Sequence, residues 1–342
     1  MSLSSAEKKI LSRIHVRSEN DPRRPEFPAD DPKFPATPTY KIKVHGFTNV
    51  WLKDESYNPT GTHKDRMAWE IVVTYRHFLL AKKNNLSSAT LPQMSIISSG
   101  SAAVAIQTQL NKYGLPNLKV LVDTELDANI VNVLEKLGCE IFQTDLSRAP
   151  LSWSDILALT HNPDGFDITS SEALDPATRF YDWLSYEVIN QSPEYCFIPF
   201  GTGTLYENIL GINKREVSTS LHDPRYKGRN AILRRCHFLG ATTNDPSSSA
   251  TKLYSPHLPF VHFNEQSIKL YQYSGFCGAQ SGVHAIQERY LEQAMQVAER
   301  NNVRAEPSGL AGLALLLQLG KKKVTEDAKI LVVSTGYTKY PK

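Results

Sequence analysis

The residues best suited to chemistry lie in the segment 53–66, which reads KDESYNPTGTHKDR. Lys64 follows two turn pairs, Asn-Pro and Thr-Gly, and begins a long helical pattern that Thr62 is placed to cap. The positive field of a helix N-terminus and a dry environment both lower the pKa of a lysine. Such an amine can attack a carbonyl group, so Lys64 is the candidate nucleophile. A surface lysine near a helix start is the alternative interpretation.

Two further segments join a strand pattern to a helix pattern. Ser98, Ser99, Gly100, Ser101 and Ala102 form the first junction. Backbone N–H groups at such a junction favour an anion such as a carboxylate. A simple turn with serine caps is the alternative.

The second junction consists of Gly201, Thr202, Gly203 and Thr204. Small residues let backbone amides close on a phosphate, and the following helix N-terminus adds its field. A tight strand-helix turn without a ligand is the alternative.

Two C-terminal motifs complete the set. Glu306 precedes Pro-Ser-Gly at the start of another helix pattern, where proline suits the first turn. Thr335, directly after Ser334, follows the last strand pattern. A capped, buried helix start and a capping or core threonine are the respective alternatives.

The composition indicates a soluble globular enzyme of two domains: 342 residues, 41% hydrophobic and 21% charged. A net charge of +3, with one dense basic run at 321–323, gives no reason to expect a nucleic-acid partner. Four cysteines without Cys-x-x-Cys spacing argue against a metal site or a disulfide scaffold and favour a cytoplasmic location. The N-terminus lacks a signal-peptide pattern, and the most apolar window, 310–319, is too short to span a membrane.

Short apolar runs alternate with amphipathic ones, which predicts an α/β fold with mostly parallel sheets and a site beyond the strand C-termini. The expected strands are 49–53, 94–98, 119–122, 140–143, 196–199, 235–239 and 330–334. The expected helices are 64–83, 102–113, 127–137, 154–159, 178–190, 205–214, 283–301 and 309–319. Residues 18–39 are expected to form an extended arm, and 221–229 and 244–274 to be irregular.

Taken together and in this order, the motifs resemble those of the fold type II pyridoxal-phosphate enzymes, the tryptophan synthase β superfamily. The run of KDE, NPTG and KDR is most similar to threonine synthase. His63, directly before Lys64, is more similar to the tryptophan synthase β pattern, since threonine synthases usually have phenylalanine there.

The resemblance implies two α/β domains with mostly parallel sheets. Residues 1–63 and 165–342 would form the large cofactor-binding domain, with an N-terminal arm at 1–39, and residues 64–164 the smaller domain. Pyridoxal 5′-phosphate would be held as an imine on Lys64, which would also act as acid and base.

The resemblance also assigns the other motifs. His63 would lie beside the cofactor, the phosphate would bind at 201–204, and the substrate carboxylate at 98–102. Ser101 stands where the family usually has an asparagine that bonds the phenolic oxygen of the cofactor, so a weaker or water-mediated contact is expected.

Two residues are expected at the cofactor ring. Glu306 would lie near the ring edge, and Thr335, with Ser334 as the second choice, would face the ring nitrogen. A neutral hydroxyl there makes the ring a weaker electron sink, which favours elimination over transamination.

The implied activity is removal of the α-proton of an amino acid, followed by β- or γ-elimination or replacement. A threonine synthase-like reaction on phosphohomoserine is the first expectation. The alternatives are a serine/threonine dehydratase, a cysteine synthase-like enzyme, and a divergent cofactor-binding protein with a non-catalytic role. The expected partners are an amino-acid substrate and a second copy of the chain, without nucleic acid or membrane.

Overall fold

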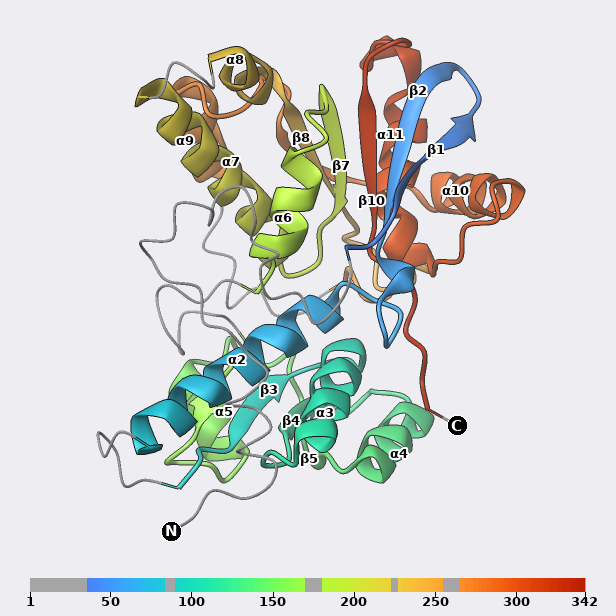
Figure 1. Ribbon diagram of the computed structural model, residues 1–342. Helices are drawn as coiled ribbons and strands as arrows, with labels where there is room; N and C mark the ends of the chain where they lie inside the picture. The colour runs from blue at the N-terminus through green and yellow to red at the C-terminus, as the bar shows by residue number, and fades with distance from the viewer. Residues whose placement is uncertain (1–35, 84–89, 170–179, 223–226, 255–264, 342) are drawn as a thin grey trace.

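The computed structural model describes residues 36–83, 90–169, 180–222, 227–254 and 265–341, which form two lobes, each built on a sheet (Figure 1). The larger sheet has the order β1-β2-β10-β7-β8-β9, with only the β1–β2 pair antiparallel. The smaller sheet, β5-β4-β3-β6, is wholly parallel. The predicted α/β class with mostly parallel sheets is confirmed.

The strands are β1 (Thr39–Val44), β2 (Phe47–Asp54), β3 (Met94–Ile97), β4 (Lys119–Asp123), β5 (Glu140–Thr144), β6 (Phe166–Asp167), β7 (Tyr195–Pro199), β8 (His237–Thr242), β9 (Gly282–Ala285) and β10 (Ile330–Ser334). The α-helices are α2 (Lys64–Lys83), α3 (Ser101–Tyr113), α4 (Ala128–Leu137), α5 (Trp153–Leu159), α6 (Asp182–Ile189), α7 (Thr204–His222), α8 (Lys227–Arg235), α9 (Glu265–Tyr273), α10 (Glu288–Arg300) and α11 (Ala311–Leu319). Short 3-10 turns are η2 (Glu55–Tyr57), η5 (Pro307–Leu310) and η6 (Gly320–Lys322).

Helices cover both faces of each sheet, so the central strands are apolar on both sides. In the larger lobe, α10 and α11 lie on one side of the sheet and α6 to α9 on the other (Figure 1). In the smaller lobe, β4 shows the alternation directly: Leu121 packs with Ile156 of α5, whereas Val120 packs in the main core with α3. The loops that follow the C-termini of β3 and β7 lead directly into α3 and α7.

Several expected elements differ in the structure. Residues 283–301 are not one helix: β9 pairs with β8, and α10 begins only at Glu288. The segments 221–229 and 244–274, expected to be irregular, contain the start of α8 and all of α9. Because β6 and β9 have two and four residues, their strand pairing depends on neighbouring strands that local sequence does not reveal.

The expected N-terminal arm and the expected domain boundary also differ in part from the structure. β1 begins at Thr39, the last residue of the expected arm; the rest of that arm lies mostly outside the described residues. β6 follows the expected boundary at 164/165 but pairs with β3 of the smaller sheet. The division into two domains otherwise stays a prediction.

Candidate active site

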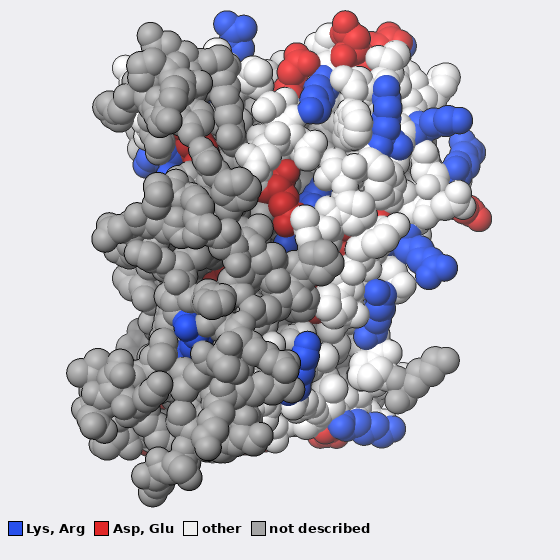
Figure 2. Space-filling model, in the orientation of Figure 1, with Lys and Arg blue, Asp and Glu red and all other residues white. Residues whose placement is uncertain are grey.

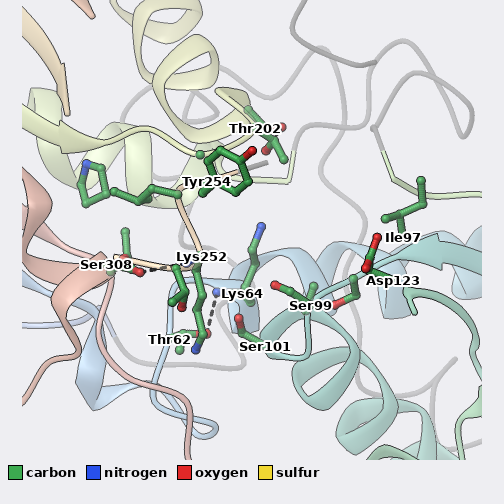
Figure 3. A pocket seen from close by; sticks show the side chains of 18 of the residues that line it. Thr62, Lys64, Ile97, Ser99, Ser101, Asp123, Thr202, Lys252, Tyr254 and Ser308 are labelled. Atoms are coloured by element: carbon green, nitrogen blue, oxygen red, sulfur yellow. Dashed lines mark hydrogen bonds between the residues drawn. The ribbon is translucent and has the colours of Figure 1, made fainter. Parts of the chain in front are cut away.

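A cavity of about 680 Å³ lies at the junction of the lobes, where strands of both sheets end (Figure 3). Its wall includes residues that follow β3, β5, β7 and β10, together with the start of α2. Among the predicted site residues, those that line it are His63, Lys64, Ser98, Ser99, Ser101, Ala102, Gly201, Thr202, Gly203, Thr204, Glu306 and Thr335. Gly100 is not part of the wall, although its neighbours on both sides are.

The loop before Lys64 is fixed to the C-terminal segment by backbone hydrogen bonds. The Gly61 carbonyl accepts from the Tyr337 amide at 2.9 Å, and the His63 amide donates to the Thr335 carbonyl at 3.3 Å. Gly61 and Gly336 both have positive φ, and a Cβ on Gly336 would lie 2.1 Å from the Gly61 carbonyl. Two glycines are therefore needed where the two loops touch.

Lys64 is the first residue of α2, and its side chain projects into the middle of the cavity (Figure 3). The Thr62 hydroxyl accepts the Lys64 amide at 3.2 Å, the predicted capping contact. Lys64 Nζ donates to Tyr181 Oη at 2.9 Å. This phenol is the only hydrogen-bond partner of the amine among the described residues, so no described carboxylate is paired with it.

His63 is expected to be neutral at physiological pH. Burial and the nearby charge of Lys64 lower the pKa of its imidazole to about 3. Its Nδ1 is buried and has no hydrogen-bond partner among the described residues, and its ring lies 5.3 Å from that of Tyr181. His63 therefore contributes a neutral ring beside the reactive amine.

A second lysine, Lys252, lines the same cavity and was missed from the sequence. Its Nζ donates to both carboxylate oxygens of Glu306, at 2.8 and 2.7 Å, and to Thr338 Oγ1 at 2.7 Å. All three N–H bonds of an ammonium group are thereby used. Lys252 is thus held by a carboxylate, and of the two lysines only Lys64 is free to act as a nucleophile.

The glycine-threonine junction has the form that a phosphate site requires. Residues 201–203 follow β7, and Thr204 begins α7, a helix of 19 residues. Gly203 has φ +84°, and the hydroxyls of Thr202 and Thr204 lie 3.2 Å apart at the cavity wall. The free N–H groups of the first helical turn and two hydroxyls can therefore donate to one anion.

The serine junction divides into capping and lining residues. Ser98 Oγ accepts from the amides of Gly100 at 3.1 Å and Ala103 at 3.3 Å, so this side chain caps α3. Ser99 and Ser101 point into the cavity on the other side of Lys64 from Thr202 (Figure 3). The serine-cap alternative thus applies to Ser98 and leaves the other two available to a ligand.

Thr335 and Glu306 lie in adjoining parts of the wall. The Thr335 amide donates to the Gly309 carbonyl at 3.2 Å, which fixes the backbone after β10. The structure records no hydrogen bond from the Thr335 hydroxyl to another described residue, so that hydroxyl is available to a ligand. The carboxylate of Glu306, in contrast, is taken by Lys252.

Apart from Lys64, the charged residues of the lysine motif lie outside the wall of the cavity. Arg66 bonds both Glu55 and Glu187, and Lys53 bonds Glu187 and the Thr37 carbonyl. Glu55 is fully buried. These residues support the start of α2, so their resemblance to threonine synthase does not come from substrate-contacting positions.

The donor set fits pyridoxal 5′-phosphate: a free lysine amine, a phosphate cradle and a neutral hydroxyl in one cavity. A family model described as "Pyridoxal-phosphate dependent enzyme" matches residues 34–336. The chain belongs to this family, and its cofactor is pyridoxal 5′-phosphate.

Solved structures of similar fold come from several enzymes. Diaminopropionate ammonia lyase from Escherichia coli, in complex with an aminoacrylate-PLP azomethine reaction intermediate, is 17% identical with a TM-score of 0.61, covering 97% of this chain and 89% of that one. O-ureido-L-serine synthase is 13% identical (TM-score 0.61; 88% and 89% covered), and threonine deaminase isoform 2 from Solanum lycopersicum is 14% identical (TM-score 0.55; 86% and 83%). A comparison with curated protein sequences found no match. At these identities the structures establish the fold alone.

The cysteines, the apolar character of the helices and the surface charge relate to the expected location and partners of the protein. The four cysteines are buried and free, and no described helix is both long and apolar enough to cross a membrane. On the face shown in Figure 2, basic side chains lie along the right edge among uncharged residues, and acidic ones gather at the upper edge. A cytoplasmic location, a homodimer and the lack of a nucleic-acid partner stay predictions.

A Gly203→Val variant is expected to lower the affinity for pyridoxal 5′-phosphate by about tenfold or more, or ~1.4 kcal/mol. A branched side chain at φ +84° forces the loop to rearrange, at a cost of about 1–2 kcal/mol, and displaces the amides of the cradle. Equilibrium titration of the apoprotein gives the affinity and thermal unfolding the stability. Gly211→Val is the control, because this glycine lies in α7, the helix that follows the loop, and a Cβ added to it would meet no atom within 4 Å. Equal affinities in the two variants would mean that the loop is only a turn.

Proposed function

We propose that the protein is a pyridoxal-phosphate-dependent lyase that removes a β-substituent from an amino acid with a neutral or cationic side chain. The observation that carries the proposal is the Lys64 amine, which lies in the cavity with a phenol as partner while the other lysine is ion-paired. The names of the similar structures, an ammonia lyase and a threonine deaminase, support the reaction class.

The bound cofactor would supply an electron sink that stabilises negative charge at the α-carbon of the substrate. Lys64 would hold the cofactor and would remove the α-proton of the substrate. The amides and hydroxyls of 201–204 bind the phosphate. Ser99 and Ser101, with the start of α3, bind the substrate carboxylate on the opposite side of the lysine.

Thr335 favours elimination over transamination in this scheme. Its hydroxyl would face the ring nitrogen, where it cannot hold a proton on that nitrogen as a carboxylate would. A ring nitrogen without a proton would make the cofactor a weaker electron sink for negative charge at the α-carbon. Such a sink favours a substrate that loses a β-substituent quickly, because the departing group takes that charge with it. Glu306 does not supply the missing negative charge, because Lys252 neutralises it.

The charge of the cavity argues against phosphohomoserine as substrate. Among the described residues of the wall, Lys252 is paired with Glu306, and Asp145 is paired with Arg148, which lies outside the wall. The other charged residues of the wall are Lys64, Asp123 and Glu125, and His63 is neutral. A second phosphate group would meet repulsion beside the carboxylates at the smaller lobe, whereas a neutral or ammonium group would not.

A threonine synthase-like replacement is the second candidate. The KDE, NPTG and KDR runs favour it. Their charged residues other than Lys64 lie outside the wall of the cavity, however, and Lys53, Glu55 and Arg66 support the start of α2. A non-catalytic cofactor-binding role has less support, because a scaffold needs no free lysine amine within the cavity.

A substrate screen with the purified holoenzyme tests the proposal. Serine, threonine, 2,3-diaminopropionate, β-chloroalanine and phosphohomoserine are each added, and 2-oxo acid, ammonia and threonine are measured. Release of a 2-oxo acid from the neutral or cationic amino acids, with little or no turnover of phosphohomoserine, is the expected result. Threonine formed from phosphohomoserine as the main product would establish the second candidate instead.

A further inference from the structure

Tyr181 lies at the reactive amine, although no sequence motif marks it. It directly precedes α6, in the larger lobe, and lines the cavity. Its Oη accepts the hydrogen bond from Lys64 Nζ at 2.9 Å, and the same amine lies 5.5 Å from the centre of the ring. The phenol is therefore the group through which a proton can leave Lys64.

The hydroxyl proton of Tyr181 has no strong acceptor among the described residues. The only recorded one is Met67 Sδ at 4.0 Å, and a thioether is a weak acceptor. Since the oxygen already accepts from Lys64, its proton is available to a ligand in the cavity. The tilted ring of His63 packs 5.3 Å away and limits how the phenol can turn.

Other groups of the wall are less suited to give a proton. His63 is neutral, and its buried Nδ1 has no hydrogen-bond partner among the described residues. Lys252 uses its three donors on Glu306 and Thr338. Tyr254 also lines the cavity, but it has no recorded bond to Lys64 that could restore its proton.

We propose that Tyr181 is the general acid that protonates the departing β-substituent and that Lys64 restores its proton. The inference rests on the proposed lyase function. The Cα–H bond breaks and its proton passes to Lys64; the electron pair forms the Cα–Cβ double bond as the bond from Cβ to the substituent breaks. The substituent leaves with that electron pair and takes the Tyr181 proton, and the Lys64 ammonium returns a proton to the phenolate. The products are an unsaturated amino acid and the protonated leaving group, so no further reactant is needed.

The test compares leaving groups that do and do not need a proton, in a Tyr181→Phe variant. Chloride from β-chloroalanine departs unprotonated, and the ammonium group of 2,3-diaminopropionate already carries the proton with which it leaves as ammonia, whereas the hydroxyl of serine needs an acid. The variant is expected to lose about 10²-fold or more of the elimination rate with serine and less than about threefold with the other two substrates. Cofactor affinity and the borohydride-fixed cofactor on Lys64 should be unchanged.

Two variants serve as references. Tyr75→Phe removes a buried hydroxyl that donates to the Pro92 carbonyl at 2.8 Å, on a helix shared with Lys64, and should not affect the ratio of rates. Tyr254→Phe tests the other phenol of the wall. An equal loss with all leaving groups, no loss at all, or a selective loss in Tyr254→Phe would overturn the assignment. So would a wild-type protein that eliminates chloride from β-chloroalanine but does not turn over serine. If the wild-type protein eliminates nothing, even from β-chloroalanine, the proposed reaction itself fails.

Discussion

A Lys64→Ala variant is expected to carry no covalently bound cofactor and to lose at least about 10²-fold of the elimination rate, the lower end of the effect of losing a positioned base. The reason is geometric: Lys64 Nζ projects into the cavity and, among the described residues, has only the Tyr181 phenol as partner. Borohydride reduction followed by peptide mapping locates the cofactor on the chain. In the unchanged protein the added mass should lie on the peptide that contains Lys64.

Lys252→Met is the matched control, because it removes the other lysine of the cavity. Its ammonium group is bound to Glu306 and Thr338, so the variant should still carry the cofactor on Lys64. Its rate should change less than that of Lys64→Ala, with a shift in the absorption spectrum because Glu306 is no longer neutralised. Cofactor mass found on Lys252, with Lys64 unlabelled, would refute the assignment.

The parts of the site that could be predicted from sequence are those with strong local signals. A turn, a cap and an amphipathic run place Lys64 at the first residue of α2. Apolar runs followed by small residues place 98–102 and 201–204 at strand C-termini, each at the carboxyl edge of its own parallel sheet. The two loops meet because the two lobes pack with these edges towards each other, which no local sequence pattern reveals.

Tyr181 and Lys252 could not be predicted in the same way, because their positions depend on distant contacts. Tyr181 is 117 residues from the lysine it bonds. Lys252 lies in an irregular segment that is fixed by its own amide bond to Ser308 Oγ at 3.1 Å and by its ion pair with Glu306. The sequence around neither residue contains a pattern that indicates a ligand.

Three charged residues of the lysine motif carry a strong sequence signal but do not line the cavity. Lys53, Glu55 and Arg66 belong to the KDE and KDR runs, which with NPTG are most similar to threonine synthase. They form a buried network with Thr37 and Glu187. This network supports the start of α2, and none of the three residues lines the cavity.

Arg66→Met is expected to lower the free energy of unfolding by about 3–5 kcal/mol at neutral pH, because it leaves the buried carboxylate of Glu55 without its main partner. Arg66 bonds Glu55 at 3.1 and 3.2 Å and Glu187 at 2.8 and 3.0 Å. Urea unfolding of the apoprotein measures the difference. Arg148→Met, which removes an exposed ion pair with Asp145 at 2.9 Å, should change the free energy of unfolding far less, because water screens this pair.

The pH dependence of that loss identifies its cause. Burial alone would raise the pKa of Glu55, but the charges of Arg66 and Lys53 lower it to about 2. In the unchanged protein, ionised Glu55 therefore stabilises the fold above the ordinary pKa of a glutamate, about 4.3, and this contribution is lost as the pH falls towards 2. Without Arg66 the pKa of Glu55 rises, so the stability difference between the two proteins should shrink as the pH is lowered from 7 to 4.

Adding Glu55→Gln to Arg66→Met removes the unpaired charge and should recover part of the loss at pH 7. A difference that does not depend on pH, and that Glu55→Gln does not reduce, would mean that Arg66 acts through packing alone.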